Sequence, residues 1–327
     1  MARVLSGIQP TGALHLGNLL GAVRNWVEDQ HRADSYFVVV DLHALTVPKS
    51  PEVLRRSTVE MATLLTAIGL DPDVCTLFVQ SHVPAHAELS WFMECTAAFG
   101  ELRRMVQFKD KSDRAEFVSA GLFTYPALQA ADILLYDTDR VPVGDDQRQH
   151  LELTRDLAAR FNARYGQTFV VPEATIPRAG ARVMDLQNPT DKMSKSSSSE
   201  AGIVYVLEDL EAVVRKFKRA VTDSESEVRY DIVAKPGVSN LLSILAACTG
   251  QDPASLAEGY SQYGPLKADT AEAVVETLRP VQARYAELSA DPGAMTAILA
   301  KGAEKAAAVA NLTLTRARDA LGLLPRG

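Results

Sequence analysis

The chain of 327 residues has no run of about 18 apolar residues, so its sequence predicts no membrane-spanning helix. Its first ten residues, MARVLSGIQP, lack the apolar core and small-residue cleavage site of a signal peptide. They are more typical of the start of a β-strand. We therefore expect a cytoplasmic protein without a membrane partner.

Cysteine is also scarce. Only Cys75, Cys95 and Cys248 occur, far apart and each within an apolar stretch. An odd, dispersed set supports neither a disulfide framework nor a four-cysteine metal site, and it suits a reducing compartment. We expect all three to be small buried hydrophobic residues.

Basic residues are also fewer than acidic ones. The 34 lysines and arginines are outnumbered by 41 acidic residues, which gives a formal net charge of −7. Nucleic-acid binding proteins usually carry a basic footprint, so this balance argues mildly against such a partner unless a local basic patch exists. The composition is otherwise that of a globular protein long enough for two domains.

The first half of the chain alternates short β-rich runs with longer amphipathic segments, which indicates a parallel sheet wrapped by helices. The predicted strands are RVLSG, SYFVVVDLHALT, CTLFVQS, DRVPVG and QTFVVP; the predicted helices span residues 53–68, 87–99 and 147–165. From about residue 207 the pattern is helical, and we find no short-period repeat. The fold class is therefore α/β: a Rossmann-type nucleotide-binding domain, residues 1–190, then a mostly α-helical domain, residues 191–327.

Two segments stand out against this background. SGIQPTGALHLGNLLGAV, residues 6–23, follows the first strand directly, at the sheet edge where nucleotides bind in doubly wound folds. It is neither G-x-G-x-x-G nor a Walker A loop, and alone it is better explained as a glycine-tolerant turn with His15 as a helix cap. DKMSKSSSS, residues 191–199, has the composition of a solvated, mobile loop carrying two lysines.

Together, HLGN at 15–18 and KMSKS at 192–196 resemble the two signatures of the class I aminoacyl-tRNA synthetases, usually written HIGH and KMSKS. Within that class the chain resembles the bacterial tryptophanyl enzymes nearly end to end. The segments that match are SGIQPTG, GELRRMVQFKDKS, AADILLYDTDRVPVGDDQRQHLELTRDLAARFN, VTDSESEVRYD and KPGVSNLL.

The resemblance implies a reaction in two steps. The carboxylate of L-tryptophan attacks the α-phosphate of ATP and pyrophosphate leaves; the tryptophanyl group then moves to tRNA(Trp). ATP would bring Mg²⁺, held mostly by phosphates and water. No nucleophilic side chain is needed, so positioning and charge stabilisation must carry the rate. A homodimer is expected because the family is dimeric, and the chain has no spare length for an editing domain.

By the same resemblance, Lys192, Ser194, Lys195 and His15 are expected to act on the phosphates, since lysine is a mobile point charge. The residues that match the family's ATP-contacting positions are Gln9, Pro10, Thr11, Gly17, Asn18, Gly144, Asp145, Asp146, Val183, Lys192, Met193, Ser194, Lys195 and Ser196. Asp145 and Asp146 could equally cap the helix that follows them.

Tryptophan selectivity is expected in TYPALQAADILLYD, where Thr124 could cap a helix with Pro126 in its first turn. Tyr125, Gln129, Asp132 and Tyr136 then share one face. Asp132 is either a solvated acid on an outer face or, as the resemblance implies, the acceptor of the indole N–H. The expected tryptophan-binding residues are Asp132, Tyr125, His43, Gln129, Gly7 and Val143.

Three features depart from the family's pattern. Leu5 stands where we expect an aromatic residue, Gln129 replaces the usual methionine, and serines follow the lysine motif where an acidic residue is common. His82 and His86 have the i, i+4 spacing of zinc ligands on a helix, but Pro84 lies between them and no third ligand is obvious, so we expect no metal site.

Two basic clusters are candidates for tRNA contact or, by default, solvated surfaces: RKFKR at 215–219, and Arg103, Arg104, Lys109 and Lys111. Two other functions remain open at this point. One is a tyrosyl-type synthetase with the same architecture. The other is a synthetase-like binding protein that does not catalyse aminoacylation.

Overall fold

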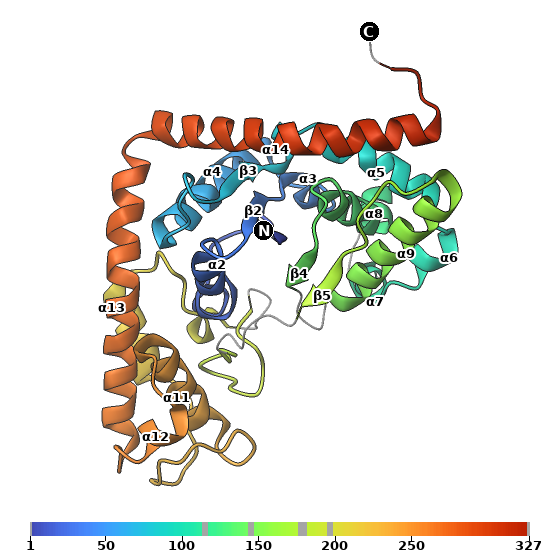
Figure 1. The fold of residues 1–327 in the computed structure, drawn as a ribbon. Coiled ribbons are helices and arrows are strands. Elements are labelled where there is room, and N and C mark those ends of the chain that lie inside the picture. Colours follow the sequence, from blue (N-terminus) through green and yellow to red (C-terminus); the bar gives the residue numbers. More distant parts are fainter. Residues whose placement is uncertain (1, 113–116, 143–146, 176–181, 195–198, 326–327) are drawn as a thin grey trace.

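Five parallel strands form the central sheet, in the order β3-β2-β1-β4-β5 (Figure 1). The computed structural model describes residues 2–112, 117–142, 147–175, 182–194 and 199–325. The strands are β1 Arg3–Ile8, β2 Asp34–Val39, β3 Thr76–Val79, β4 Arg140–Pro142 and β5 Glu173–Thr175. The chain adds β2 and β3 on one side of β1, then β4 and β5 on the other, so the carboxyl ends of β1 and β4 flank the point where the order reverses. Ligands bind at this point in open α/β sheets, and the predicted Rossmann-type fold is confirmed.

The last strand differs from the prediction. We expected a strand in QTFVVP, residues 167–172, but β5 begins at Glu173. The reason is a helix side chain: the Oδ1 of Asn162 accepts the backbone N–H groups of Thr168 and Phe169, both at 2.9 Å. Phe169 is buried 4.8 Å from the ring of Phe161. The backbone of this segment is thus bound to a helix, and cannot pair with a neighbouring strand.

The helices of the first half cover both faces of the sheet (Figure 1). They are α1 Leu16–Asn18, the π-helix η1 Leu19–Val23, α2 Arg24–Asp29, α3 Asp41–Ala44, α4 Pro51–Ile68, the 3₁₀ turn η2 Gln80–His82, α5 Ala85–Thr96, α6 Phe99–Arg103, α7 Val106–Ser112, α8 Ala120–Leu134 and α9 Arg148–Tyr165. α8 begins earlier than we expected, because the Oγ of Ser119 caps it by accepting the N–H of Leu122 at 3.1 Å. Pro126 therefore lies inside the helix and not in its first turn.

The chain after Ser199 is built from helices: η4 Glu200–Gly202, α10 Leu210–Lys218, α11 Pro236–Thr249, α12 Pro253–Ala257, α13 Tyr263–Ser289 and α14 Pro292–Leu321. α13 and α14 are long and run in different directions, so that the chain turns between them (Figure 1). α13 packs on α4, α10 and α11, and α14 returns across β3 and α5. At Gly302 a Cβ would lie 1.8 Å from the carbonyl oxygen of Leu77, so glycine is what lets the α14 backbone rest on the strand.

Two apolar cores hold these layers together. One lies between the sheet, η1, α4, α11 and α13; the other lies under α5, α8, α9 and α14. Cys75 is buried in the first core, and burial raises the pKa of its thiol to about 11. Cys95 is exposed on α5, so the prediction that all three cysteines are buried is wrong. Within the described ranges, no helix is long and apolar enough to cross a bilayer.

Candidate active site

The glycine-rich segment makes a tight turn where β1 ends. The N–H of Thr11 donates to the carbonyl oxygen of Gln9 at 2.8 Å, and Gly12 follows with φ of 80°. His15 then caps α1: its Nδ1 accepts the N–H of Asn18 at 3.3 Å, while its own N–H donates to the Oδ1 of Asn18 at 3.4 Å. The HLGN motif is therefore a closed capping box with a buried imidazole.

This turn is tied to a segment much later in the chain. The N–H of Leu16 donates to the carbonyl of Val204 at 2.8 Å, and the N–H of Val206 donates to that of Leu14 at 2.9 Å. His15 lies between these two bonds, opposite Tyr205 in an antiparallel bridge. The segment just after the lysine motif is thus held directly against the first signature.

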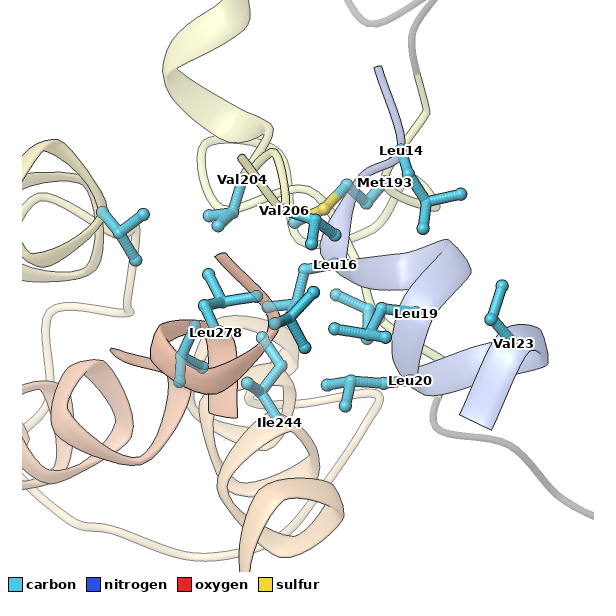
Figure 2. Packing of buried hydrophobic residues seen from close by; sticks show 14 of the residues in the cluster. Leu14, Leu16, Leu19, Leu20, Val23, Met193, Val204, Val206, Ile244 and Leu278 are labelled. Carbon is cyan, nitrogen blue, oxygen red and sulfur yellow. The ribbon is translucent and has the colours of Figure 1, made fainter. Parts of the chain in front are cut away.

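The described part of the lysine motif is anchored in the same place. The N–H of Met193 donates to the carbonyl of Val183 at 3.1 Å, and Lys192 forms an antiparallel bridge with Met184. The side chain of Met193 is 1% exposed and lies in the same apolar cluster as Leu14 (Figure 2). Lys192 is exposed beside this anchor. The two signatures therefore meet in space.

Gly17 and Val183, two of the expected ATP positions, also lie together. A Cβ on Gly17 would come 3.6 Å from the Cβ of Val183 and 3.1 Å from the Nδ1 of His15. A larger residue at position 17 would therefore press on both neighbours. Because glycine has no side chain, the turn can pack closely against residue 183.

Asn240 on α11 binds the backbone of Met184, the residue that forms the bridge with Lys192. Its Oδ1 accepts the N–H of Met184 at 2.9 Å, and its Nδ2 donates to the carbonyl of Met184 at 3.0 Å. Asn240 is 4% exposed, so both bonds are shielded from water. This geometry gives one residue of the KPGVSNLL motif a structural role.

We expect Asn240→Ala to lower the rate of amino-acid activation by about tenfold, because the peptide of Met184 loses both partners and the bridge to Lys192 loosens. Steady-state kinetics with thermal unfolding checks this. Asn311→Ala, at an exposed position of α14, is the matched control. Equal activity in the two variants would contradict the supporting role.

A second cluster lies at the carboxyl ends of β2 and β3. Asp132 on α8 is 3% exposed, so it is not the solvated acid of the alternative interpretation. Its Oδ2 accepts from the Nε2 of His43 at 2.8 Å. Its Oδ1 accepts from the Nε2 of Gln80 at 2.7 Å and from the Nδ1 of His86 at 2.6 Å. Burial alone would raise the pKa of Asp132, but the hydrogen bonds from both histidines outweigh it and lower the pKa to about 2.

The predicted polar face of α8 continues on both sides of Asp132. The hydroxyl of Tyr125 is 2.7 Å from the Nε2 of His150 on α9, and burial raises the pKa of this tyrosine to about 12. The Nε2 of Gln129 donates to the Oε1 of Gln147 at 3.3 Å. Tyr125 and His43 form an edge-on ring contact at 6.2 Å between centroids. His43, Tyr125 and Asp132 are therefore one connected group.

Sequence reasoning missed three members of this group: Gln80, His86 and His150. His86 was considered only as a metal ligand, but its two ring nitrogens are engaged by Asp132 and Tyr136. The available signal was a polar residue soon after a buried strand: Gln80 directly follows β3, and His43 lies four residues after the end of β2. Leu5, which stands where an aromatic residue was expected, is buried in the second apolar core.

The structure places the other expected residues as follows. Gly7 and Gln9 are exposed at the end of β1, Pro10 is buried, and Thr11, Gly17, Asn18 and Ser194 are partly buried. The expectations for Val143, Gly144, Asp145, Asp146, Lys195 and Ser196 lie outside the described residues.

The RKFKR cluster is less available than its sequence suggests. Arg215 pairs with Asp209 and Glu211, both at 3.6 Å, and Lys216 pairs with Glu208 at 2.6 Å. In the other candidate cluster, Arg103, Arg104 and Lys109 are exposed, and the side chain of Lys111 lies outside the described part.

A family model described as tRNA synthetases class I (W and Y) matches residues 1–279. The chain is 58% identical to tryptophan–tRNA ligase 1 of Streptomyces coelicolor over 330 residues, covering 99% of this chain and 98% of that protein. The solved tryptophanyl-tRNA synthetase of Mycoplasma pneumoniae matches with a TM-score of 0.91 and 37% identity, over 99% and 98% of the two chains. That of Campylobacter jejuni, complexed with ADP and tryptophan, matches with a TM-score of 0.86 and 32% identity, over 98% and 100%.

The chain therefore belongs to the class I tRNA synthetases of the tryptophanyl and tyrosyl group, and it is an aminoacyl-tRNA ligase. Its full-length relatives at 52% to 58% identity carry the name tryptophan–tRNA ligase. A tyrosyl-tRNA synthetase of Aeropyrum pernix matches at 21% identity with a TM-score of 0.67, which is a likeness of fold alone.

Proposed function

We propose that this member of the family is a tryptophan–tRNA ligase. It activates L-tryptophan with ATP to form tryptophanyl-adenylate and pyrophosphate, and then transfers the tryptophanyl group to tRNA(Trp). ATP enters as its Mg²⁺ complex, with the metal held mainly by phosphates and water. The reaction takes place in the cytoplasm, where tRNA is charged.

The observation that carries this proposal is the meeting of the two signatures. Met193 is packed against Leu14, and backbone hydrogen bonds join residues 204–206 to residues 14–16. An ammonium group carried next to Met193 can therefore reach a triphosphate lying on the turn after β1. The same turn lies at the switch point of the sheet, where the fold itself favours a nucleotide.

The roles divide between the two sides of this cleft. Lys192 and Lys195 follow the negative charge as pyrophosphate leaves, and Ser194 and Ser196 donate hydrogen bonds to the phosphates. Gln9, Thr11 and Asn18 hold the nucleotide from the turn, with His15 keeping that turn in shape. Gly144, Asp145 and Asp146 contact the ribose, and the backbone of Val183 meets adenine.

Tryptophan occupies the other end of the site. Asp132 accepts the indole N–H, while His43, Tyr125, Gln129, Gly7 and Val143 form the walls. A site built around a buried acceptor rejects side chains without a matching donor, because the acceptor would stay unpaired. Pocket shape must exclude tyrosine, which does carry a donor.

Pyrophosphate exchange tests the function directly. Purified protein is mixed with ATP, labelled pyrophosphate and each amino acid in turn. We expect exchange with tryptophan and not with tyrosine or phenylalanine. Exchange with tyrosine alone would instead support the tyrosyl alternative, and no exchange with any amino acid would support a non-catalytic binding protein.

The protein acts as a homodimer in this proposal. Large apolar side chains are exposed on or next to the helices α5 to α8, which contact one another: Trp91 at 63%, Phe99 at 67%, Val106 at 56% and Phe117 at 67%. The ring of Phe99 packs 5.2 Å from that of Phe123, so the patch continues into the core. Apolar area of this kind is typical of an obligate interface.

We expect Trp91→Glu to shift the protein from dimer to monomer, weakening association by at least about tenfold, because a carboxylate would be buried without a partner. Analytical ultracentrifugation over a concentration series measures this. Val233→Glu, at an 87% exposed position remote from α5, is the control and should remain dimeric. A monomeric wild-type protein would refute the assignment.

Each of the two proposed domains has its own function. Residues 1–190 bind ATP and tryptophan, and residues 191–327 carry the lysine loop and face the anticodon side of tRNA. Because Arg215 and Lys216 are already paired with acids, the exposed Arg103 and Arg104 are the better candidates for phosphate contact.

A further inference from the structure

The carboxylate of Asp132 is held in an unusually complete set of donors. Three N–H groups point at it, two on Oδ1 and one on Oδ2, from three different elements: α3, η2 and α5. A carboxylate offers two lone pairs on each oxygen. Within the described part of the chain, Oδ1 is therefore fully occupied and Oδ2 has one lone pair left.

The two donors on Oδ1 are themselves fixed at their far ends. The Oε1 of Gln80 accepts the N–H of Leu42 at 3.1 Å, which forces its amide nitrogen toward Asp132. The Nε2 of His86 lies 2.8 Å from the hydroxyl of Tyr136. Both donor side chains are 0% exposed, so water cannot replace these bonds.

The proton on Nδ1 of His86 follows from these contacts. The ionised carboxylate of Asp132 can only accept, so Nδ1 of His86 must carry a proton. The Nε2 on the other side of the ring is held by the hydroxyl of Tyr136. His86 therefore aims its Nδ1–H at Oδ1.

We infer that His86 and Gln80 are positioning residues for tryptophan selection: they immobilise Oδ1 of Asp132, so that the remaining lone pair of Oδ2 is the one that accepts the indole N–H. This inference rests on the proposed function and adds which oxygen is used and what aims it. Neither residue touches the substrate. Their effect is to fix the direction of an acceptor that would otherwise rotate about the Cβ–Cγ bond, and fixed direction is what a selective hydrogen bond requires.

A pair of amide substitutions at residue 86 separates positioning from packing. The amide nitrogen of His86→Asn takes the place of Nδ1 and can still donate to Asp132. That of His86→Gln takes the place of Nε2 and reaches Tyr136 instead. We expect the KM for tryptophan to stay within about threefold of wild type in the asparagine variant and to rise about tenfold or more in the glutamine variant. The KM for ATP, measured in the same assays, is the internal reference.

A substrate analogue gives a readout that a merely structural role would not move. In the benzothiophene analogue of tryptophan, sulfur replaces the indole N–H, so no hydrogen bond to Oδ2 can form. We expect the penalty of His86→Gln to disappear with this analogue. A penalty of equal size for tryptophan and the analogue, or equal KM values for the two variants, would overturn the inference.

Two further measurements cover the remaining outcomes. If His86→Gln does not fold, nitrogen NMR of the histidine-labelled wild type still tests the arrangement, since Nδ1 of His86 must carry a proton and an unprotonated Nδ1 would overturn the proposal. If the wild-type protein gives no tryptophan-dependent exchange, the proposed function fails first. Exchange in the wild type with identical behaviour of both variants refutes this inference alone.

Discussion

Lys192→Ala and Lys195→Ala are each expected to lower kcat for tryptophan-dependent pyrophosphate exchange by about 10²–10³-fold, the loss typical of removing one group that stabilises transition-state charge. Tryptophan affinity should change little, because the proposed role of both lysines is at the phosphates of ATP. Lys192 is exposed next to the buried Met193, so its ammonium group is free to move while its backbone is held. Exchange kinetics with tryptophan binding by fluorescence checks both statements.

Lys301→Ala is the matched control for these variants. It removes an equally exposed lysine on α14, whose pair with Asp73 at 2.9 Å is a surface ion pair of small value. Exchange should continue at the wild-type rate. Unchanged turnover in both Lys192→Ala and Lys195→Ala would remove the assigned role and favour a non-catalytic protein.

Asp132→Ala is expected to lower kcat/KM for tryptophan and to reduce its preference over phenylalanine by about 10²-fold or more. Two effects combine. The indole N–H would lose its proposed acceptor, and the N–H groups of His43, Gln80 and His86 are left buried without one. The melting temperature should fall as well, because unsatisfied buried donors each cost about 1–3 kcal/mol.

Asp137→Asn is the control for Asp132→Ala, because it changes another aspartate only five residues away. Asp137 has φ of 48°, a conformation that asparagine tolerates, and its side chain pairs with Arg316 at the surface. This variant should retain wild-type selectivity. If Asp132→Ala keeps an unaltered preference for tryptophan while folded, Asp132 does not choose the side chain.

Much of the fold could be predicted because the signals were local. Buried parallel strands read as continuous apolar runs, as in β2 and β3. The helix expected over residues 53–68 is α4, which begins two residues earlier, at Pro51 after the cap Ser50. The failures were also physical. Residues 167–172 carry strand-like side chains, yet Asn162 binds their backbone, and Ser119 starts α8 ahead of Pro126. Both errors arose where one polar side chain decided the path of the backbone.

The sequence by itself determined the family, the order of the elements and which residue types serve the chemistry, because motifs and periodicity are written in consecutive residues. Only the tertiary structure decided which of them meet. Met193 joins Leu14 across the chain, Asn240 supports Met184, and Gln80 with His86 encloses Asp132. Such contacts depend on where separate helices and strand ends come together in space. A local sequence pattern does not contain this information, because each partner is an ordinary residue within its own segment.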